Sequence, residues 1–293
     1  MSKLFHLSGH IAKHPCRTCN LEGTPYKIPF KTKKGQQREK TQYYYPLHPP
    51  VTGQAPQMVI NTDHLLYRTH DGYIADGNAS HDNPLLAVET GVKGVSPLVL
   101  TLETISFPES TPFDIMHLVF LGFVRVLCAL LSGKFFQAKD LNNHDGRMSE
   151  TDWVQLGVDM ANIRAPVSSG RRPRNIEKYV KGFKAEELSN FLTIYLLPLV
   201  FKRVNHTTYR ALQRLVLAVS LAMSFELTFR EIMEFERQMT LFIQWFYDTY
   251  YQGKYERLPV CKYTIHGLLH LARDIQNWGS ASYFWQFPEV HLY

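Results

Sequence analysis

Apolar residues are concentrated most strongly between Ser106 and Gly133, where nearly every position from Ile115 to Leu131 is hydrophobic. Only His117, Gly122 and Arg125 interrupt this run. A helix that is apolar on all sides either spans a membrane or lies at the centre of a core. Seventeen residues are short for a span, and a central arginine costs about 2.5–3.5 kcal/mol on insertion scales. The run therefore predicts a buried core helix.

The residues at the start of this helix have capping chemistry. Thr111 is positioned to cap, Pro112 suits the first helical position, and Asp114 follows three residues after the cap. Asp114 and His117 lie three residues apart and therefore share a face in the first turn. We interpret Asp114 as complementing the helix dipole and His117 as a hydrogen-bonded core histidine. A functional role for the pair stays open.

Helical periodicity returns further along the chain. Ser149 and Asp152 form a capping-box-like pair ahead of apolar positions that continue to Ile163. Apolar residues then recur at helical spacing in three successive stretches, 185–199, 209–225 and 228–251. The short connections between these stretches predict an antiparallel helical layer.

The N-terminal third differs from the rest, because residues 23–97 are rich in proline, glycine and asparagine and show little periodicity. The basic run from Lys31 to Lys40 is expected to be an exposed loop, with a phosphate contact as the alternative. The segment from Tyr43 to Pro46 predicts a short edge strand or an extended stretch packed on a neighbour. A long loop region of this kind indicates function or disorder rather than core.

The chain has 293 residues and a formal net charge of +6, which suggests an acidic partner without identifying one. Basic residues are densest between Arg171 and Lys184, where Tyr179 and Phe183 are interleaved with them. This segment is the best candidate for contacts to a phosphate backbone, and a solvated surface is the alternative. The candidate DNA-binding residues are Arg171, Arg172, Arg174, Lys178, Lys181 and Lys184.

Cysteine usage favours a reducing compartment. The chain has four cysteines, and its first residues contain no hydrophobic secretory segment. We therefore expect no disulfide framework and a cytosolic or nuclear protein. Cys128 lies in the apolar run, which suggests a packing role.

Two pairs of residues near the chain ends have metal-ligand spacing. Cys16 and Cys19 form a CxxC pair, which suits two positions of a tetrahedral zinc, whereas a redox pair would usually follow a strand. His266 and His270 stand four apart on a predicted helix that Thr264 caps and that runs to about residue 277. Packed or surface histidines are the alternative. Together the two pairs complete a Cys2His2 shell that would join segments about 250 residues apart.

Three stretches carry a resemblance to a known family. They are GHIAKHPCRTC, PFDIMHLVFLGFVRVL, and CKYTIHGLLHLARDIQNWG with SYFWQFPE. In this order they resemble the transposase domain of CACTA-type (En/Spm) DNA transposons. The resemblance implies a helical insertion inside an RNase H-like catalytic core, with a zinc on Cys16, Cys19, His266 and His270 that fastens one to the other. Asp114 and His117 match the family's DxxH pair, whose role the sequence does not indicate.

Departures from the family pattern concern the catalytic acids. Such transposases use two metal ions held by three acidic residues. The resemblance implies two aspartates before the CxxC pair, and the fifteen residues that precede Cys16 contain no acid. The third acid would follow Trp285. In a direct alignment with the family motif, Val290 stands at the position of this acid, and Glu289 stands there only if the alignment is shifted by one residue. We therefore assign no catalytic residue, keep Glu289 only as a candidate, and expect magnesium only if the protein is catalytic.

The predicted fold is mainly α, a helical insertion domain with small, incomplete RNase H-like remnants at the ends and a loop-rich N-terminal third. We predict three segments: 1–97 with the CxxC pair, 98–260 with the helical insertion, and 261–293 with the HxxxH helix. The function hypothesis is a transposon-derived, catalytically inactive DNA-binding protein, nuclear by resemblance, with a possible homo-oligomer and no membrane partner. The alternatives are an active DNA nucleotidyltransferase whose acids come from another chain, and a scaffold protein that does not bind DNA.

Overall fold

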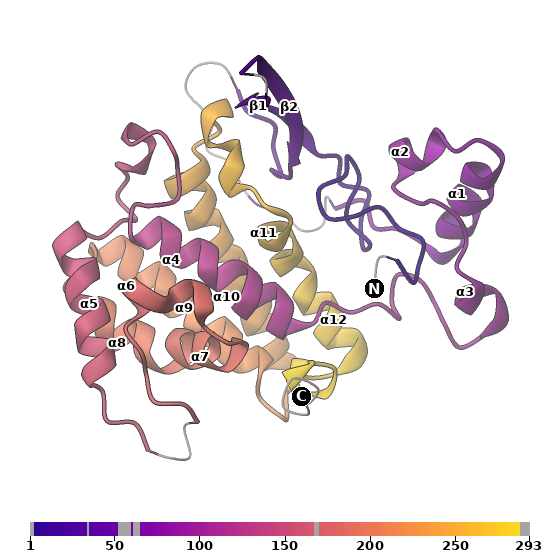
Figure 1. Cartoon of the computed structure of the whole chain (residues 1–293). Helices are drawn as coiled ribbons and strands as arrows, with labels where there is room; N and C mark the ends of the chain where they lie inside the picture. Colours follow the sequence, from indigo (N-terminus) through magenta and orange to yellow (C-terminus); the bar gives the residue numbers. More distant parts are fainter. Residues whose placement is uncertain (1–2, 34, 52–59, 61–64, 167–169, 288–293) are drawn as a thin grey trace. The chain divides into compact units, whose positions relative to one another are not determined.

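Helices make up most of the structure, a computed structural model that describes residues 3–33, 35–51, 60, 65–166 and 170–287 (Figure 1). In this part of the chain the only sheet is a two-stranded antiparallel hairpin. The prediction of a mainly α fold is confirmed, and the RNase H-like remnants at the ends stay a prediction. The chain divides into two units, each discontinuous in sequence: residues 1–112 with 253–270, and residues 113–252 with 271–293.

The hairpin of the first unit consists of β1 (Thr24–Lys31) and β2 (Gln37–Tyr44). The prediction that residues 31–40 form a loop is therefore wrong for Lys31 and for residues 37–40, which belong to the two paired strands. Gly35, at a φ of 78°, lies in the turn between them. The extended segment predicted after Gln42 is confirmed. Tyr44 ends β2, and the backbone N–H of Tyr45 donates to the carbonyl of Cys261 over 2.7 Å.

Three short helices of the first unit surround a small core. They are α1 (His70–Asp82), α2 (Leu86–Thr90) and α3 (Pro97–Thr101). The Tyr73 hydroxyl donates to the carbonyl of Phe5 over 3.0 Å and accepts from the N–H of Ser96 over 2.8 Å. The sequence pattern does not reveal these helices, because α1 has few apolar residues and two glycines. The core consists of Phe5, Leu7, Tyr73, Val92, Val99 and Phe107.

The apolar run forms the buried centre of the second unit. It comprises η2, a π-helix (Met116–Val124), followed by α4 (Arg125–Leu131). The core prediction is confirmed by their burial, and no helix in the described part of the chain has the length and apolarity to cross a bilayer. The predicted cap is wrong. The Thr111 hydroxyl donates to the carbonyl of Pro108 over 2.7 Å, and the Asp114 carboxylate accepts from the N–H groups of Met116 and His117 instead.

The remaining helices of the second unit follow the predicted stretches within a few residues. Ser149 caps α5 (Glu150–Asn162) by accepting from the N–H of Asp152 over 3.0 Å. The three periodic stretches become α7 (Ala185–Asn190), η6 (Phe191–Tyr195) and α8 (Leu196–Val200); α9 (His206–Ala222); and α10 (Phe229–Phe246) with η7 (Tyr247–Tyr251). Shorter turns are η3 (Asp140–Asn142), α6 (Ile176–Tyr179), η5 (Val180–Gly182) and η10 (Ala281–Tyr283).

The HxxxH segment lies in a succession of helical turns. They are η8 (Tyr255–Val260), α11 (Tyr263–Gly267), η9 (Leu268–His270) and α12 (Leu271–Trp278). The helix begins at Tyr263, so Thr264 lies inside it and the prediction that Thr264 caps it is wrong. The helix ends at Trp278, close to the predicted end, and Gly279 follows it at a φ of 80° with its N–H donating to the carbonyl of Ile275.

Candidate metal centre

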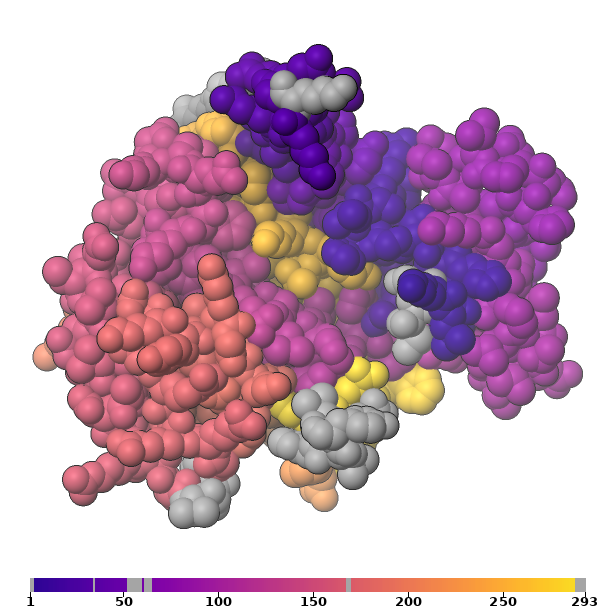
Figure 2. All heavy atoms as spheres, in the orientation of Figure 1, coloured from indigo at the N-terminus to yellow at the C-terminus, as the bar shows by residue number. Residues whose placement is uncertain are grey.

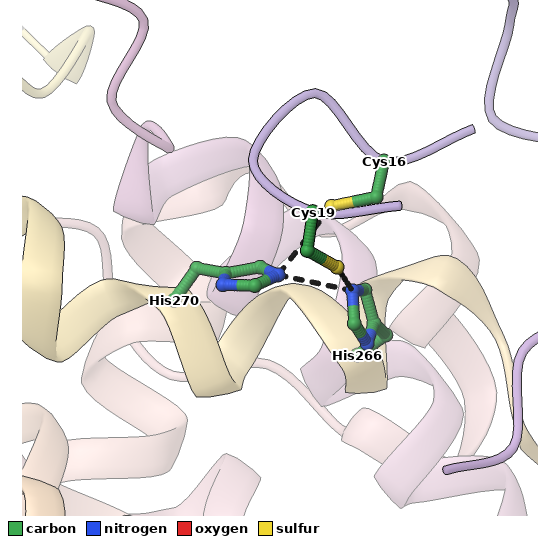
Figure 3. Close-up of side chains that lie close together, drawn as sticks. All are labelled: Cys16, Cys19, His266 and His270. Carbon is green, nitrogen blue, oxygen red and sulfur yellow. Dashed lines mark hydrogen bonds between the residues drawn. The ribbon is translucent and has the colours of Figure 1, made fainter. Parts of the chain in front are cut away.

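Cys16 and Cys19 lie in a loop of the first unit that is held by a short stretch of antiparallel pairing. The N–H of Asn20 donates to the carbonyl of Leu66, and the N–H of Arg68 donates to the carbonyl of Thr18, each over 2.9 Å. Inside the loop, the N–H of Thr18 donates to the Cys16 sulfur over 3.4 Å. Both sulfurs are thereby held on the same side of the loop (Figure 3).

The side chain of Arg68 holds this loop in place by hydrogen bonds. Its side chain is buried, with Nε donating to the carbonyl of Cys16 over 2.9 Å and Nη2 to the carbonyl of Thr90 over 2.7 Å. Burial lowers the pKa of Arg68, and the nearby Cys16 and Asp76 oppose that shift. Nothing in the sequence singles out Arg68, because a single arginine in a stretch without periodicity gives no signal.

His266 and His270 come from α11 and η9, and both are fully buried. Their positions four residues apart bring both rings to one side of the helix, as the sequence predicts (Figure 3). Aromatic rings lie beside them. Tyr67 has its centroid 5.8 Å from that of His270, and Tyr263 lies 6.5 Å from His266. These contacts limit the freedom of both imidazoles.

The four side chains converge on one point (Figure 3). The Cys16 sulfur lies 3.4 Å from Nε2 of His270, the Cys19 sulfur lies 3.2 Å from Nε2 of His266, and the two Nε2 atoms are 3.0 Å apart. All four ligand atoms lie within 4.8 Å of one another. Zinc bond lengths of about 2.3 Å to sulfur and 2.0–2.1 Å to nitrogen give tetrahedron edges of about 3.3–3.8 Å. The donor set therefore fits a tetrahedral metal ion.

The pKa values of the two buried thiols are shifted in opposite directions. Burial raises the pKa of Cys16, but the hydrogen bond from Cys19 and the nearby His270 and His266 outweigh it, so the pKa lies well below its ordinary value. The same hydrogen bond, together with burial, raises the pKa of Cys19. A bound cation would favour the thiolate form of both cysteines, because thiolates and not thiols are metal ligands.

The DxxH residues lie in the second unit and contribute nothing to this cluster. The Asp114 carboxylate also accepts from the N–H of Gln286 over 3.1 Å and from Nδ1 of His117. The prediction that His117 is a core histidine is wrong, because its side chain is 57% exposed. Asp114 therefore joins the start of the central helix to the segment near Trp285. Glu289, the weak catalytic candidate, lies outside the described residues.

The basic segment from Arg171 to Lys184, also in the second unit, splits into two kinds of side chain. Arg174 makes a bidentate ion pair with Glu187, at 2.6 and 2.8 Å, and its guanidinium lies 4.8 Å from the Phe183 ring centroid. It also donates to the carbonyl of Gly182 over 3.0 Å. Arg174 therefore makes contacts that stabilise the fold of this segment. The other five candidates are exposed: Arg171, Arg172, Lys178, Lys181 and Lys184.

Comparison of the chain with protein-family models, with curated proteins and with solved structures finds no match.

Proposed function

We propose that this protein is a transposon-derived DNA-binding protein, related to the CACTA-type transposases that its motifs resemble and acting in the nucleus. The observation that carries this proposal is the convergence of Cys16 and Cys19 with His266 and His270. The resemblance requires these residues, from opposite ends of the chain, to form one cluster. Their separation of 247 to 254 residues makes such a convergence a demanding requirement.

Zinc is the metal that this site suits best. Two thiolates and two imidazoles in a tetrahedral arrangement match its preferred ligands. All four positions would be filled by protein, as in structural rather than catalytic zinc sites. The ion would supply folding free energy by tying residues 16–19 to residues 266–270.

The basic segment is the proposed DNA-binding surface. Two nearby acids are already engaged, since Glu177 pairs with Lys134 and Glu187 pairs with Arg174. The five exposed cations (Arg171, Arg172, Lys178, Lys181 and Lys184) form no ion pair with the described residues. Such a surplus of positive charge favours phosphate contacts, which depend on salt and not on sequence.

Binding of a short fluorescein-labelled duplex, followed by anisotropy over a range of salt concentrations, tests this surface. We expect the double variant Arg171→Gln/Arg172→Gln to bind more weakly and to flatten the salt dependence by about two units, because each phosphate contact adds about 0.9 to the slope. The matched control is Lys139→Gln/Arg230→Gln, which removes the same charge from exposed positions elsewhere. An unchanged slope in the first variant, or no binding by the wild type, contradicts the proposal.

A further inference from the structure

The β1–β2 hairpin is exposed to an unusual degree for a sheet. Every residue at positions 29–31 and 37–41 is exposed, although successive side chains of a strand point to opposite faces. Both faces of the distal half, defined here as residues 28–31 and 37–40, are therefore accessible. Figure 2 shows the dark hairpin atoms at the surface of the molecule.

The hairpin is held at its base by aromatic residues of the first unit. The Tyr26 ring lies 5.7 Å from that of Tyr44 and 5.1 Å from that of Tyr255, measured between centroids. The N–H of Lys27 donates to the Tyr255 hydroxyl over 3.1 Å. An isolated two-stranded hairpin is only marginally stable in water. This anchorage gives the exposed distal half a fixed base.

The charge of the hairpin is strongly one-sided. Glu39 is the only acidic residue of the hairpin. Among the residues that the structure describes, no basic side chain of the hairpin forms a salt bridge. Cations held this close together repel one another, so the arrangement costs stability unless an anion binds. The basic residues from the start of β1 to the end of β2 are Lys27, Lys31, Lys33, Lys34, Arg38 and Lys40.

The strand register gives one face of the distal half a mixed character. Phe30 lies opposite Arg38, and Ile28 lies opposite Lys40, so these four side chains share a face. Phe30 is 44% exposed, although a large aromatic side chain is usually buried. This face therefore presents an apolar centre with cations beside it.

We propose that the distal half of the hairpin inserts into the major groove of duplex DNA. A two-stranded ribbon fits that groove, which is about 12 Å wide and 8.5 Å deep, and eight-residue strands of about 26 Å are long enough to reach in from the anchored base. Lys31, Arg38 and Lys40 contact phosphates on the two sides of the groove. Phe30 faces base edges, where aromatic side chains make apolar contact with thymine methyl groups.

This inference shares its partner with the proposed function but depends on different residues, in the other unit. The test compares Lys31→Gln/Arg38→Gln/Lys40→Gln with the control Lys3→Gln/Lys139→Gln/Arg230→Gln, which removes the same charge from other exposed positions. With the labelled duplex, we expect the hairpin variant to lower the salt slope by about three units more than the control. Equal slopes in the two variants overturn the proposal.

Two further measurements test the groove assignment. Phe30→Ala should weaken duplex binding at least threefold without changing the salt slope, because it removes an apolar contact and no charge. Methyl green, which occupies the major groove, should compete with the wild type for duplex. Unchanged affinity in Phe30→Ala, no competition by methyl green, or equal binding of a single strand of the same sequence overturns insertion into the major groove.

These measurements test the two proposed DNA-binding surfaces independently of each other. A slope that falls only in Arg171→Gln/Arg172→Gln supports the basic segment and overturns the hairpin proposal. A slope that falls only in the hairpin variant supports the hairpin and overturns the basic segment as the contact surface. Absence of duplex binding by the wild type overturns both, whereas binding only to anionic vesicles would make the hairpin a membrane-surface element instead.

Discussion

The candidate metal centre and the basic segment both begin as short motifs in the sequence, yet their residues have different uses. All four candidate ligands lie in one buried cluster, with their donor atoms within 4.8 Å of one another. In the basic segment, Arg174 turns inward to Glu187, while the other five candidates remain exposed. Ligand spacing is therefore the more specific signal. A positive charge serves equally well in an internal ion pair, on a solvated surface or in a phosphate contact.

Apart from the candidate metal ligands, the largest effect is expected at Arg68, which holds the cysteine loop. Arg68→Gln leaves the carbonyls of Cys16 and Thr90 without their charged donor, and we expect it to lower the free energy of unfolding by about 3 kcal/mol. Removing such a supporting residue should also weaken metal affinity about tenfold while one ion still binds. Denaturant unfolding and competition with a chromogenic chelator measure these two quantities.

A matched control for Arg68 is Arg230→Gln, which removes an exposed arginine from α10. We expect this control to change the free energy of unfolding by no more than about 0.5 kcal/mol. If Arg68→Gln changed the free energy of unfolding as little as the control, the side chain of Arg68 would not be needed to hold the cysteine loop.

A smaller effect is expected when the ion pair inside the basic segment is broken. Glu187→Gln should lower the free energy of unfolding by about 1–2 kcal/mol at neutral pH, because it removes a charged acceptor from Arg174. Burial alone would raise the pKa of Glu187, but Arg174 and the N–H of Lys184 lower it below the ordinary value. The stabilisation is therefore present above the unfolded carboxyl pKa of about 4.3 and is lost as pH falls through the folded value.

The pH dependence distinguishes this ion pair from simple packing. The stability difference between wild type and Glu187→Gln should shrink as the pH is lowered below about 4. Arg174→Gln should lower stability while leaving the salt slope of DNA binding close to that of the wild type. A slope that falls by about one unit in Arg174→Gln would make Arg174 a phosphate contact after all.

The smallest effect is expected at the DxxH pair, in which Asp114 makes several hydrogen bonds and His117 is exposed. Asp114→Ala removes the cap of the central helix and its bond to the N–H of Gln286, so we expect a loss of about 1 kcal/mol. Asp114→Asn, which still caps, should lose less. His117→Ala, at an exposed position, should stay within about 0.5 kcal/mol of the wild type. A larger loss in His117→Ala than in Asp114→Ala would show that the histidine is the structural member of the pair.

Strong periodicity made the second unit predictable from the sequence. The apolar run, the Ser149 cap and the stretches that become α9 and α10 each carry a signal along the chain itself. The prediction that Thr111 caps the helix is wrong because its hydroxyl donates to the carbonyl of Pro108, in a turn that the local spacing does not reveal. The π-helical form of residues 116–124 also has no signature in the apolar pattern.

The first unit was harder to predict, because its structure depends on contacts between distant segments. The hairpin was hard to predict because β2 has no apolar residue before Tyr43 that could alternate with polar ones, although Ile28 and Phe30 alternate in β1. The role of Arg68 depends on the carbonyls of Cys16 and Thr90, which its own neighbours in sequence do not indicate. The four candidate ligands were predictable because CxxC and HxxxH each place two possible donors at a spacing that suits one ion.

The metal content of the purified protein tests most directly whether residues 16–19 and 266–270 share one ion, and it is measured by mass spectrometry of the folded chain and by elemental analysis. We predict one zinc per chain, lost in Cys16→Ser and in His270→Ala together with a fall in thermal stability. Cys128→Ser and His117→Ala are the matched controls and should keep the metal. Folded wild type without metal, or zinc retained in both ligand variants, would show that residues 16–19 and 266–270 do not share one ion.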